Sequence, residues 1–283
     1  MATSIATVVA CAQLQPRLGD PVGNIARTCE ALHAAADQGA QVIVLPELAS
    51  SGYAFADHAE ALAAAQPVDG PCLTTWQEVA AQRDLIVVGG FCELGADDAV
   101  HNSAALIDAS GVRAVYRKAH LWDRERLIFD AGDAVPPVVD TRVGRIAMVI
   151  CYDLEFPEWV RIAALAGAQL LCAPTNWPDA PRPPGERAGE VVRVMAEAGM
   201  NRMFIAVCDR VGAERGVEWV GGSVIVDPDG WPLAGGDPCP EPRIILAHCS
   251  LAEADDKGVG GLSDIHADRR PGLYRGIVTS THR

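Results

Sequence analysis

The sequence predicts an α/β protein whose β-sheets are covered by helices on their outer faces. Segments with apolar residues at helical spacing alternate along the chain with β-branched, apolar runs that are typical of strands. Long apolar runs of this kind favour sheets that are covered by other layers. No linker divides the chain before its polar, glycine-rich end. We therefore expect one domain over residues 1–251 and a tail over residues 252–283.

The order of the elements follows from the apolar pattern and from the turn residues between them. Gly39 ends the first helix, Gly70 and Pro71 open the third, and residues 108–111 and 227–230 are turns between strands. Residues 122–135 are irregular and charged, and residues 176–185 form a proline-rich loop. The predicted strands cover residues 5–13, 42–45, 85–92, 101–107, 112–117, 143–150, 169–173, 203–209, 223–226 and 243–249. The predicted helices cover residues 24–38, 59–65, 73–82, 157–166 and 186–198.

Charge and cysteine usage limit the partners and the compartment. The 283 residues carry a net charge of -14. That charge argues against nucleic acid or an anionic membrane surface as a partner, because either needs a basic face. The nine cysteines are odd in number, form no CxxC pair and lie mostly in apolar runs, which favours reduced thiols in a cytoplasmic protein. No apolar run reaches the ~18 residues of a membrane span, and the start of the chain does not resemble a signal peptide.

Three reactive side chains each follow an apolar strand. Glu47 ends the run Val-Ile-Val-Leu-Pro-Glu, Lys118 ends Ala-Val-Tyr-Arg-Lys, and Cys151 follows Arg-Ile-Ala-Met-Val-Ile. Each residue alone has an ordinary interpretation, as a solvated loop residue, a surface lysine or a buried inert thiol. Together they supply what a cysteine needs to attack an amide: a base that returns the proton to the departing nitrogen, and a cation for the oxyanion.

The motifs around these residues resemble those of the nitrilase superfamily of carbon–nitrogen hydrolases. The resemblance covers nearly the whole chain, and its strength lies in several short matches in the right order. The matching segments are Pro46-Glu47, Ser51-Gly52-Tyr53, Tyr116-Arg117-Lys118-Ala119-His120-Leu121, Phe129-Asp130-Ala131-Gly132-Asp133, Cys151-Tyr152-Asp153-Leu154-Glu155-Phe156-Pro157-Glu158, Asn176-Trp177-Pro178 and Asp268-Arg269-Arg270-Pro271-Gly272-Leu273-Tyr274. Ala131 stands where the family usually has proline, and Glu197-Ala198 where it usually has Glu-Asn. Neither departure touches the three reactive residues.

The resemblance implies a four-layer α-β-β-α sandwich and a catalytic triad. It assigns Glu47 as general base and acid, Lys118 as oxyanion stabiliser and Cys151 as nucleophile. The backbone N–H of Tyr152 would be the second oxyanion donor. Glu125 matches a second glutamate of the family and would position the substrate amide and the triad, although its ordinary interpretation is a surface residue. The resemblance implies no metal and no organic cofactor, and a homodimer or larger homo-oligomer in which the tail crosses to a partner.

Aromatic residues near the nucleophile predict a small, partly apolar substrate pocket, with core packing as the alternative for each. The candidate walls are Tyr53, Trp122, Phe129, Tyr152, Phe156 and Trp177. No pair of arginines directly follows Cys151 to hold the carboxylate of an N-carbamoyl amino acid, and Arg161 is an unsupported exception. The sequence therefore favours hydrolysis of a small aliphatic amide through a cysteine thioester.

The sequence leaves other functions open. An N-carbamoyl (ureido) amidohydrolase, acting on a carbamoyl-putrescine or a carbamoyl amino acid, is the first alternative, and a true nitrilase is the next. A non-catalytic scaffold of the same fold would be expected to lose one of the three reactive residues, and all three are present. A metal-dependent amidohydrolase would need clustered histidines, whereas the histidines here are scattered singly.

Overall fold

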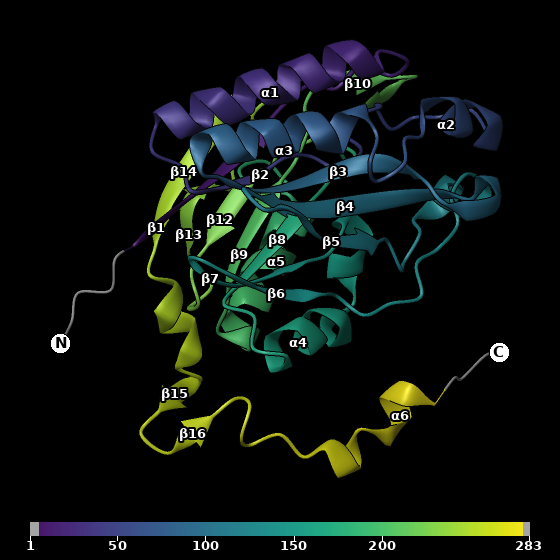
Figure 1. Ribbon diagram of the computed structural model, residues 1–283. Helices are drawn as coiled ribbons and strands as arrows, with labels where there is room; N and C mark the ends of the chain where they lie inside the picture. The colour runs from purple at the N-terminus through teal and green to yellow at the C-terminus, as the bar shows by residue number, and fades with distance from the viewer. Residues whose placement is uncertain (1–5, 280–283) are drawn as a thin grey trace.

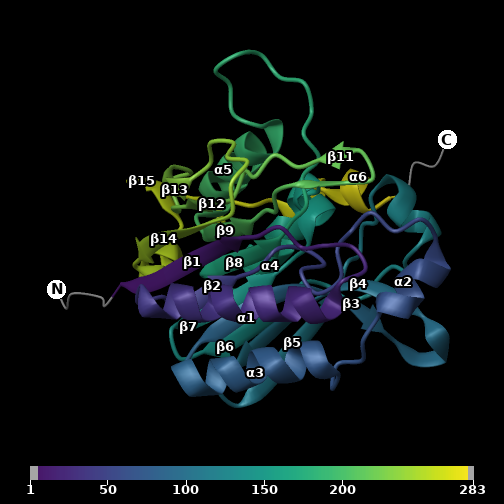
Figure 2. The ribbon, with the colours of Figure 1, turned by 90° about the horizontal axis from the view of Figure 1, so that it is seen from above.

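Two six-stranded sheets face each other in the computed structural model, which describes residues 6–279. Helices α1 (Pro21–Asp37) and α3 (Pro71–Arg83) cover the outer face of one sheet, and α4 (Pro157–Leu165) and α5 (Gly189–Asn201) cover the other (Figure 1). Figure 2 shows α1 and α3 side by side over the first sheet. The predicted α-β-β-α sandwich is confirmed. The predicted division at residue 251 stays a prediction, and residues 1–5 and 280–283 of the two predicted parts lie outside the described residues.

The first sheet has the strand order β14-β1-β2-β3-β4-β5. Strands β1, β2 and β3 are parallel, whereas β14 is antiparallel to β1 and β4 is antiparallel to both β3 and β5. Strand β5 therefore runs in the same direction as β2, so both strands end at the same edge of the sheet. The bounds are β14 (Arg243–Cys249), β1 (Thr7–Gln13), β2 (Val42–Val44), β3 (Ile86–Leu94), β4 (Val100–Asp108) and β5 (Gly111–Arg117).

The second sheet has the order β13-β12-β9-β8-β7-β6. Its centre is again parallel, because β7, β8 and β9 run together, while β6 and β12 pair antiparallel to their neighbours. The bounds are β13 (Pro232–Gly235), β12 (Val224–Val226), β9 (Phe204–Cys208), β8 (Leu170–Pro174), β7 (Gly144–Met148) and β6 (Val138–Thr141).

Three apolar clusters hold the layers together. One lies between the sheets and includes Val44, Ile86, Met148 and Ile225, and the other two lie between each sheet and its own helices. Because side chains alternate along a strand, each central strand contributes to the middle cluster and to one outer cluster. Continuous apolar strands are the consequence, as the sequence predicts.

The remaining elements are short. Helix α2 (His58–Ala64) lies beyond β3, a hairpin joins β10 (Ala213–Glu214) to β11 (Val217–Glu218), and the tail holds β15 (Gly258–Gly260), β16 (Ser263–Asp264) and α6 (Arg275–Val278). The proline-rich loop before α5 projects from the body in Figure 2. The tail runs past α4 away from the sheets (Figure 1). Among residues 6–279, no helix is both long and apolar enough to cross a membrane.

The structure corrects several predicted elements. The predicted turn at 227–230 joins β12 to β13, a strand absent from the prediction, whereas residues 243–249 form β14 in the other sheet. Strand β6 was also not predicted, because it is a short, half-buried edge strand with a weak apolar pattern. Helix α1 starts at Pro21 rather than 24, since Asp20 caps it and proline suits the first helical turn. Helix α5 lies three residues later than predicted, because the proline-rich loop extends further.

Candidate active site

Glu47 and Lys118 meet because β2 and β5 end at the same edge of the first sheet. Both side chains are fully buried. Lys118 Nζ donates a hydrogen bond to Glu47 Oε1 at 2.7 Å, and Asn102 Nδ2 donates to the same oxygen at 2.7 Å. Glu47 Oε2 is buried and has no hydrogen-bond partner within residues 6–279, so it is the oxygen available for proton transfer.

Glu125 is the second carboxylate on Lys118. Residues 123–127 form a short 3₁₀ helix in the segment predicted to be irregular, and this helix buries the Glu125 side chain. Lys118 Nζ donates to Glu125 Oε1 at 2.8 Å, and the Tyr53 hydroxyl donates to the same oxygen at 2.8 Å. The other oxygen, Oε2, accepts from the backbone N–H of Trp122 at 2.9 Å. The alternative of an exposed surface Glu125 is therefore wrong.

Burial and charge set the protonation states at this site. Burial raises the pKa of Glu47 to about 7, against the opposing effect of Lys118 and with a further rise from Glu125. Burial works against the charge of Lys118, but Glu125 and Glu47 outweigh it and raise the lysine pKa well above its ordinary value. A charged Lys118 therefore stands beside a Glu47 that exchanges a proton near neutral pH.

Cys151 lies at a sharp bend just beyond β7. Its backbone φ of 44° is in the left-handed region, which a non-glycine residue adopts only when the surrounding structure enforces it. The residue is half-buried, and its thiol donates a weak hydrogen bond to the backbone oxygen of Asn176 at 3.9 Å. Asn176 Nδ2 in turn donates to the backbone oxygen of Glu47 at 3.0 Å. Asn176 therefore connects the nucleophile candidate of one sheet to the base candidate of the other.

The surroundings of Cys151 favour the protonated thiol over the thiolate. Burial raises its pKa well above the usual value, Glu47 adds to that rise, and Lys118 opposes it. A thiol of this kind needs a neighbouring base before it can attack a carbonyl carbon. Glu47 is the group at this site with the appropriate pKa.

Asp153 fixes the bend that carries Cys151. The Asp153 carboxylate is buried, accepts from the backbone N–H of Ile150 at 3.0 Å and from that of His120 at 3.1 Å, and contacts the His120 ring at 2.7 Å. The Tyr116 hydroxyl donates at 2.8 Å to Asp153 Oδ2, the same oxygen that accepts from Ile150, whereas both His120 contacts are to Oδ1. This network ties the bend after β7 to the segment around Lys118, so the backbone N–H groups near Cys151 are held in place.

Cys151 opens into a cavity of about 300 Å³. Three of the predicted wall residues, Trp122, Tyr152 and Trp177, line it. Tyr53 and Phe129 line a second cavity of about 390 Å³, which shares Trp122 with the first and also contains Glu125. Trp122 therefore stands between the two cavities.

Phe156, the sixth predicted wall residue, lies behind the wall. Its ring stacks on His120 with centroids 3.8 Å apart and meets the Tyr152 ring edge-on at 5.2 Å. Phe156 therefore supports Tyr152, and the lining residues of the two cavities do not include it. The prediction that it forms a pocket wall is not supported by this position.

The sequence interpretation missed several residues that shape the site. Asn102, inside β4, carries no local signal, and only strand pairing brings it to Glu47. Asp209 accepts from the backbone N–H groups of Trp177 and Gly222, both at 2.9 Å, and so holds the loop after β8. Asp209 directly follows β9, and a charged residue at the end of an apolar strand is the same signal that singled out Glu47. Among residues 6–279, no group of three or more histidine, cysteine, aspartate or glutamate side chains is arranged to hold a metal ion.

Comparisons with known proteins place the chain among enzymes of one kind. The family model described as carbon-nitrogen hydrolase matches residues 8–256. A protein named nitrilase from Pyrococcus abyssi (strain GE5 / Orsay) is 34% identical over 269 residues, which cover 94% of this chain and 98% of the relative. A protein named N-carbamoylputrescine amidase from Solanum lycopersicum is 33% identical over 292 residues, which cover 96% of this chain and 95% of the relative.

A solved structure of an amidase from Nesterenkonia sp. superposes on this chain with a TM-score of 0.77 and 28% identity, covering 97% of both chains. A variant of that amidase carries the acetamide moiety of fluoroacetamide covalently at its active site cysteine, and another variant was solved in complex with butyramide. The similarity therefore extends to proteins with a cysteine that reacts with small amides.

Proposed function

Because this chain belongs to the carbon–nitrogen hydrolase family and is an enzyme of that class, we propose that it hydrolyses a small aliphatic amide to a carboxylic acid and ammonia. The observation that carries this proposal is the buried contact of Lys118 with both Glu47 and Glu125, at a place where all three charges are close enough to act on the pKa of Cys151. A lone buried cation between two carboxylates, next to a protonated thiol, suits acyl transfer through a covalent intermediate.

The proposed reaction proceeds in two halves. Glu47 Oε2 takes the proton of Cys151, and the thiolate forms a bond to the amide carbon while Lys118 and the backbone N–H of Tyr152 hold the oxyanion. The carbon–nitrogen bond then breaks as Glu47 returns the proton to the nitrogen, and ammonia leaves a thioester on Cys151. Glu47 next removes a proton from water, the hydroxide adds to the thioester carbon, and the thiol and the carboxylic acid are released.

Substrate size is supported by the cavity. A volume of about 300 Å³ between Trp122, Tyr152 and Trp177 suits a short amide with a partly apolar chain. Arg161 is not in this cavity: it donates to the backbone oxygen of Met200 and faces the tail. Arg161 therefore does not supply a partner for the carboxylate of an N-carbamoyl amino acid. A relative named N-carbamoylputrescine amidase keeps the ureido alternative open.

The proposal is tested by measuring ammonia release from acetamide, propionamide, butyramide, N-carbamoyl-putrescine, an N-carbamoyl amino acid and propionitrile. We expect the highest kcat/KM with one of the three alkyl amides. A higher value with either carbamoyl compound than with the carboxamide that carries the same far end would replace the amide proposal by the ureido alternative. A protein that is folded but releases no ammonia from any of them would favour the scaffold alternative.

Asn102→Ala should shift the pH dependence of the reaction. The hydrogen bond from Asn102 stabilises the charged form of Glu47 and so lowers the pKa of that carboxyl. Without it the Glu47 pKa rises above about 7. Because the proposed base must be deprotonated, activity falls as the pH drops through this pKa, and the variant should lose activity at a higher pH, by roughly one unit. The pH profile of kcat/KM measures the shift, and an unchanged acid limb would contradict the role of Glu47 as base.

We also propose a homodimer that uses the tail, and a cytoplasmic location. The tail exposes large apolar side chains, including Leu262, Leu273 and Ile277, and forms a groove of about 570 Å³ with α4. Such side chains are typical of a surface that a second copy covers. Analytical ultracentrifugation tests the assembly, and a monomer at micromolar concentration would contradict it. The nine free cysteines support a reducing compartment.

A further inference from the structure

Three charged side chains line the same cavity as Cys151. Glu155 comes from the short helix that starts at Cys151, and Glu190 and Arg193 come from the first turns of α5. On this arrangement, and resting on the proposed amide hydrolysis, we propose that the outer end of the cavity is a subsite for a positively charged group. The preferred substrate is then an amide whose far end carries an ammonium.

The charges of the three residues do not balance. Arg193 Nε lies 2.7 Å from Glu155 Oε1, and its terminal nitrogen lies 3.2 Å from Glu190 Oε1. One guanidinium is therefore shared by two carboxylates, and the group carries a formal charge of -1. The Glu155 and Glu190 side chains are only 32% and 24% exposed, so bulk water screens this charge less than on an open surface.

A substrate carboxylate would meet the wrong charge here. Arg193 is the only cationic residue among those that line the cavity within the described part of the chain, and both glutamates already occupy it. An anionic tail would have to displace Glu155 or Glu190 from Arg193 and remain beside both carboxylates. An ammonium tail instead adds a second cationic partner for the two carboxylates and leaves the guanidinium in place.

The inner end of the cavity fixes the orientation of such a substrate. Asn176 lines the cavity, and its Oδ1 atom is buried without a hydrogen-bond partner in residues 6–279. A buried acceptor of this kind is stabilised when a ligand N–H donates to it. The carboxamide N–H₂ supplies that donor next to Cys151, so the rest of the molecule points outward. Its methylene chain would pass Trp122, Trp177 and Pro178 to reach the charged group.

The test compares substrates that share a reacting amide and differ only in the tail. The series are 4-aminobutanamide, 5-aminopentanamide and 6-aminohexanamide, the alkyl amides of matching length, and the matching ω-carboxylate amides. A primary amine of this kind is charged at neutral pH. We expect kcat/KM for at least one ω-amino amide to exceed that of its alkyl counterpart about three- to fivefold, which is the size of effect that a partly exposed ion pair gives. The ω-carboxylate amides should have the lowest kcat/KM of the three series. The preference should shrink as salt is added.

Two variants separate charge from shape. The quantity to compare is the ratio of kcat/KM for the ω-amino amide to kcat/KM for the alkyl amide. Glu190→Gln should lower this ratio, because it removes a negative charge from the subsite. Arg193→Met should raise it, because it removes a positive charge. Glu78→Gln is the matched control, because it makes the same change at an exposed position of α3, and it should leave the ratio unchanged. A wild-type ratio near one, or a shift in the same direction in both variants, would overturn the charged subsite. If no amide is hydrolysed, the proposed function itself fails. If alkyl amides are hydrolysed without a preference for the ammonium, only this inference fails.

Discussion

Cys151→Ala will leave the protein folded and without measurable amide hydrolysis. The variant has no sulfur to form the thioester. Within residues 6–279, Cys151 is the only cysteine that lines this cavity, and Glu47 and Lys118 are close enough to act on its pKa. Loss of a nucleophile that acts as part of a catalytic unit lowers kcat by more than about a thousandfold. The fold should be preserved, because the thiol makes one weak hydrogen bond and alanine is a smaller side chain at the same backbone position. Ammonia release and the thermal melting temperature measure both effects.

Fluoroacetamide gives the same prediction a chemical readout. In addition to any hydrolysis of fluoroacetamide at its amide carbon, the Cys151 sulfur should displace fluoride and retain a carbamidomethyl group that peptide mass spectrometry locates. Cys239→Ala is the matched control, because Cys239 is another partly exposed free thiol outside the site. That variant should keep its activity and its label at Cys151. A label elsewhere, or substantial turnover by Cys151→Ala, would remove Cys151 from its proposed role.

Lys118→Arg should also inactivate the enzyme, although the charge is kept. The ammonium is fully buried and donates to Glu47 at 2.7 Å and to Glu125 at 2.8 Å. A planar guanidinium is larger, and its fixed donor directions cannot place one compact charge between two carboxylates and a developing oxyanion. Loss of an oxyanion donor costs on the order of 10²–10³ in kcat, and we expect at least that decrease. The larger side chain should also lower the melting temperature, because Lys118 is fully buried and a longer group must displace its neighbours.

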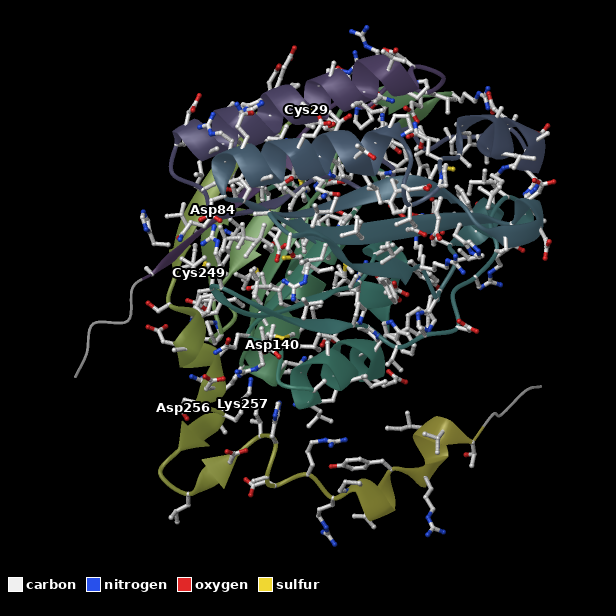
Figure 3. The ribbon with its side chains drawn as sticks, in the orientation of Figure 1. Cys29, Asp84, Asp140, Cys249, Asp256 and Lys257 are labelled. Atoms are coloured by element: carbon white, nitrogen blue, oxygen red, sulfur yellow. The ribbon has the colours of Figure 1, made fainter. Side chains whose placement is uncertain are left out.

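The second lysine provides the control for this substitution. Lys257 lies at the start of the tail in Figure 3, and its Nζ donates to the backbone oxygens of Asn201 and Arg202 at the end of α5. Arginine can donate to the same carbonyl oxygens, so Lys257→Arg should keep activity near the wild-type value. Near-normal turnover by Lys118→Arg would contradict the proposed oxyanion role, since that role needs a compact ammonium.

The sequence by itself determined the fold class and singled out the candidate reactive residues. Apolar periodicity located most strands and helices, because an element that buries one face has apolar residues at regular spacing, whichever layer packs against it. Glu47, Lys118 and Cys151 each follow such a strand, so their positions could be identified from short motifs alone. The edge strands β6 and β13 were missed, because a half-buried strand has no strong periodic pattern.

Only the tertiary structure decided how these residues meet and what surrounds them. The antiparallel pairing of β4 places Asn102 on Glu47, and the approach of the two sheets brings Asn176 between Glu47 and Cys151. The charged group of Glu155, Glu190 and Arg193 likewise joins segments that are distant in the chain. Burial, pKa and net charge at a site depend on through-space distances between such segments. A one-dimensional pattern records which residues a strand ends on, but it does not record which strand lies opposite.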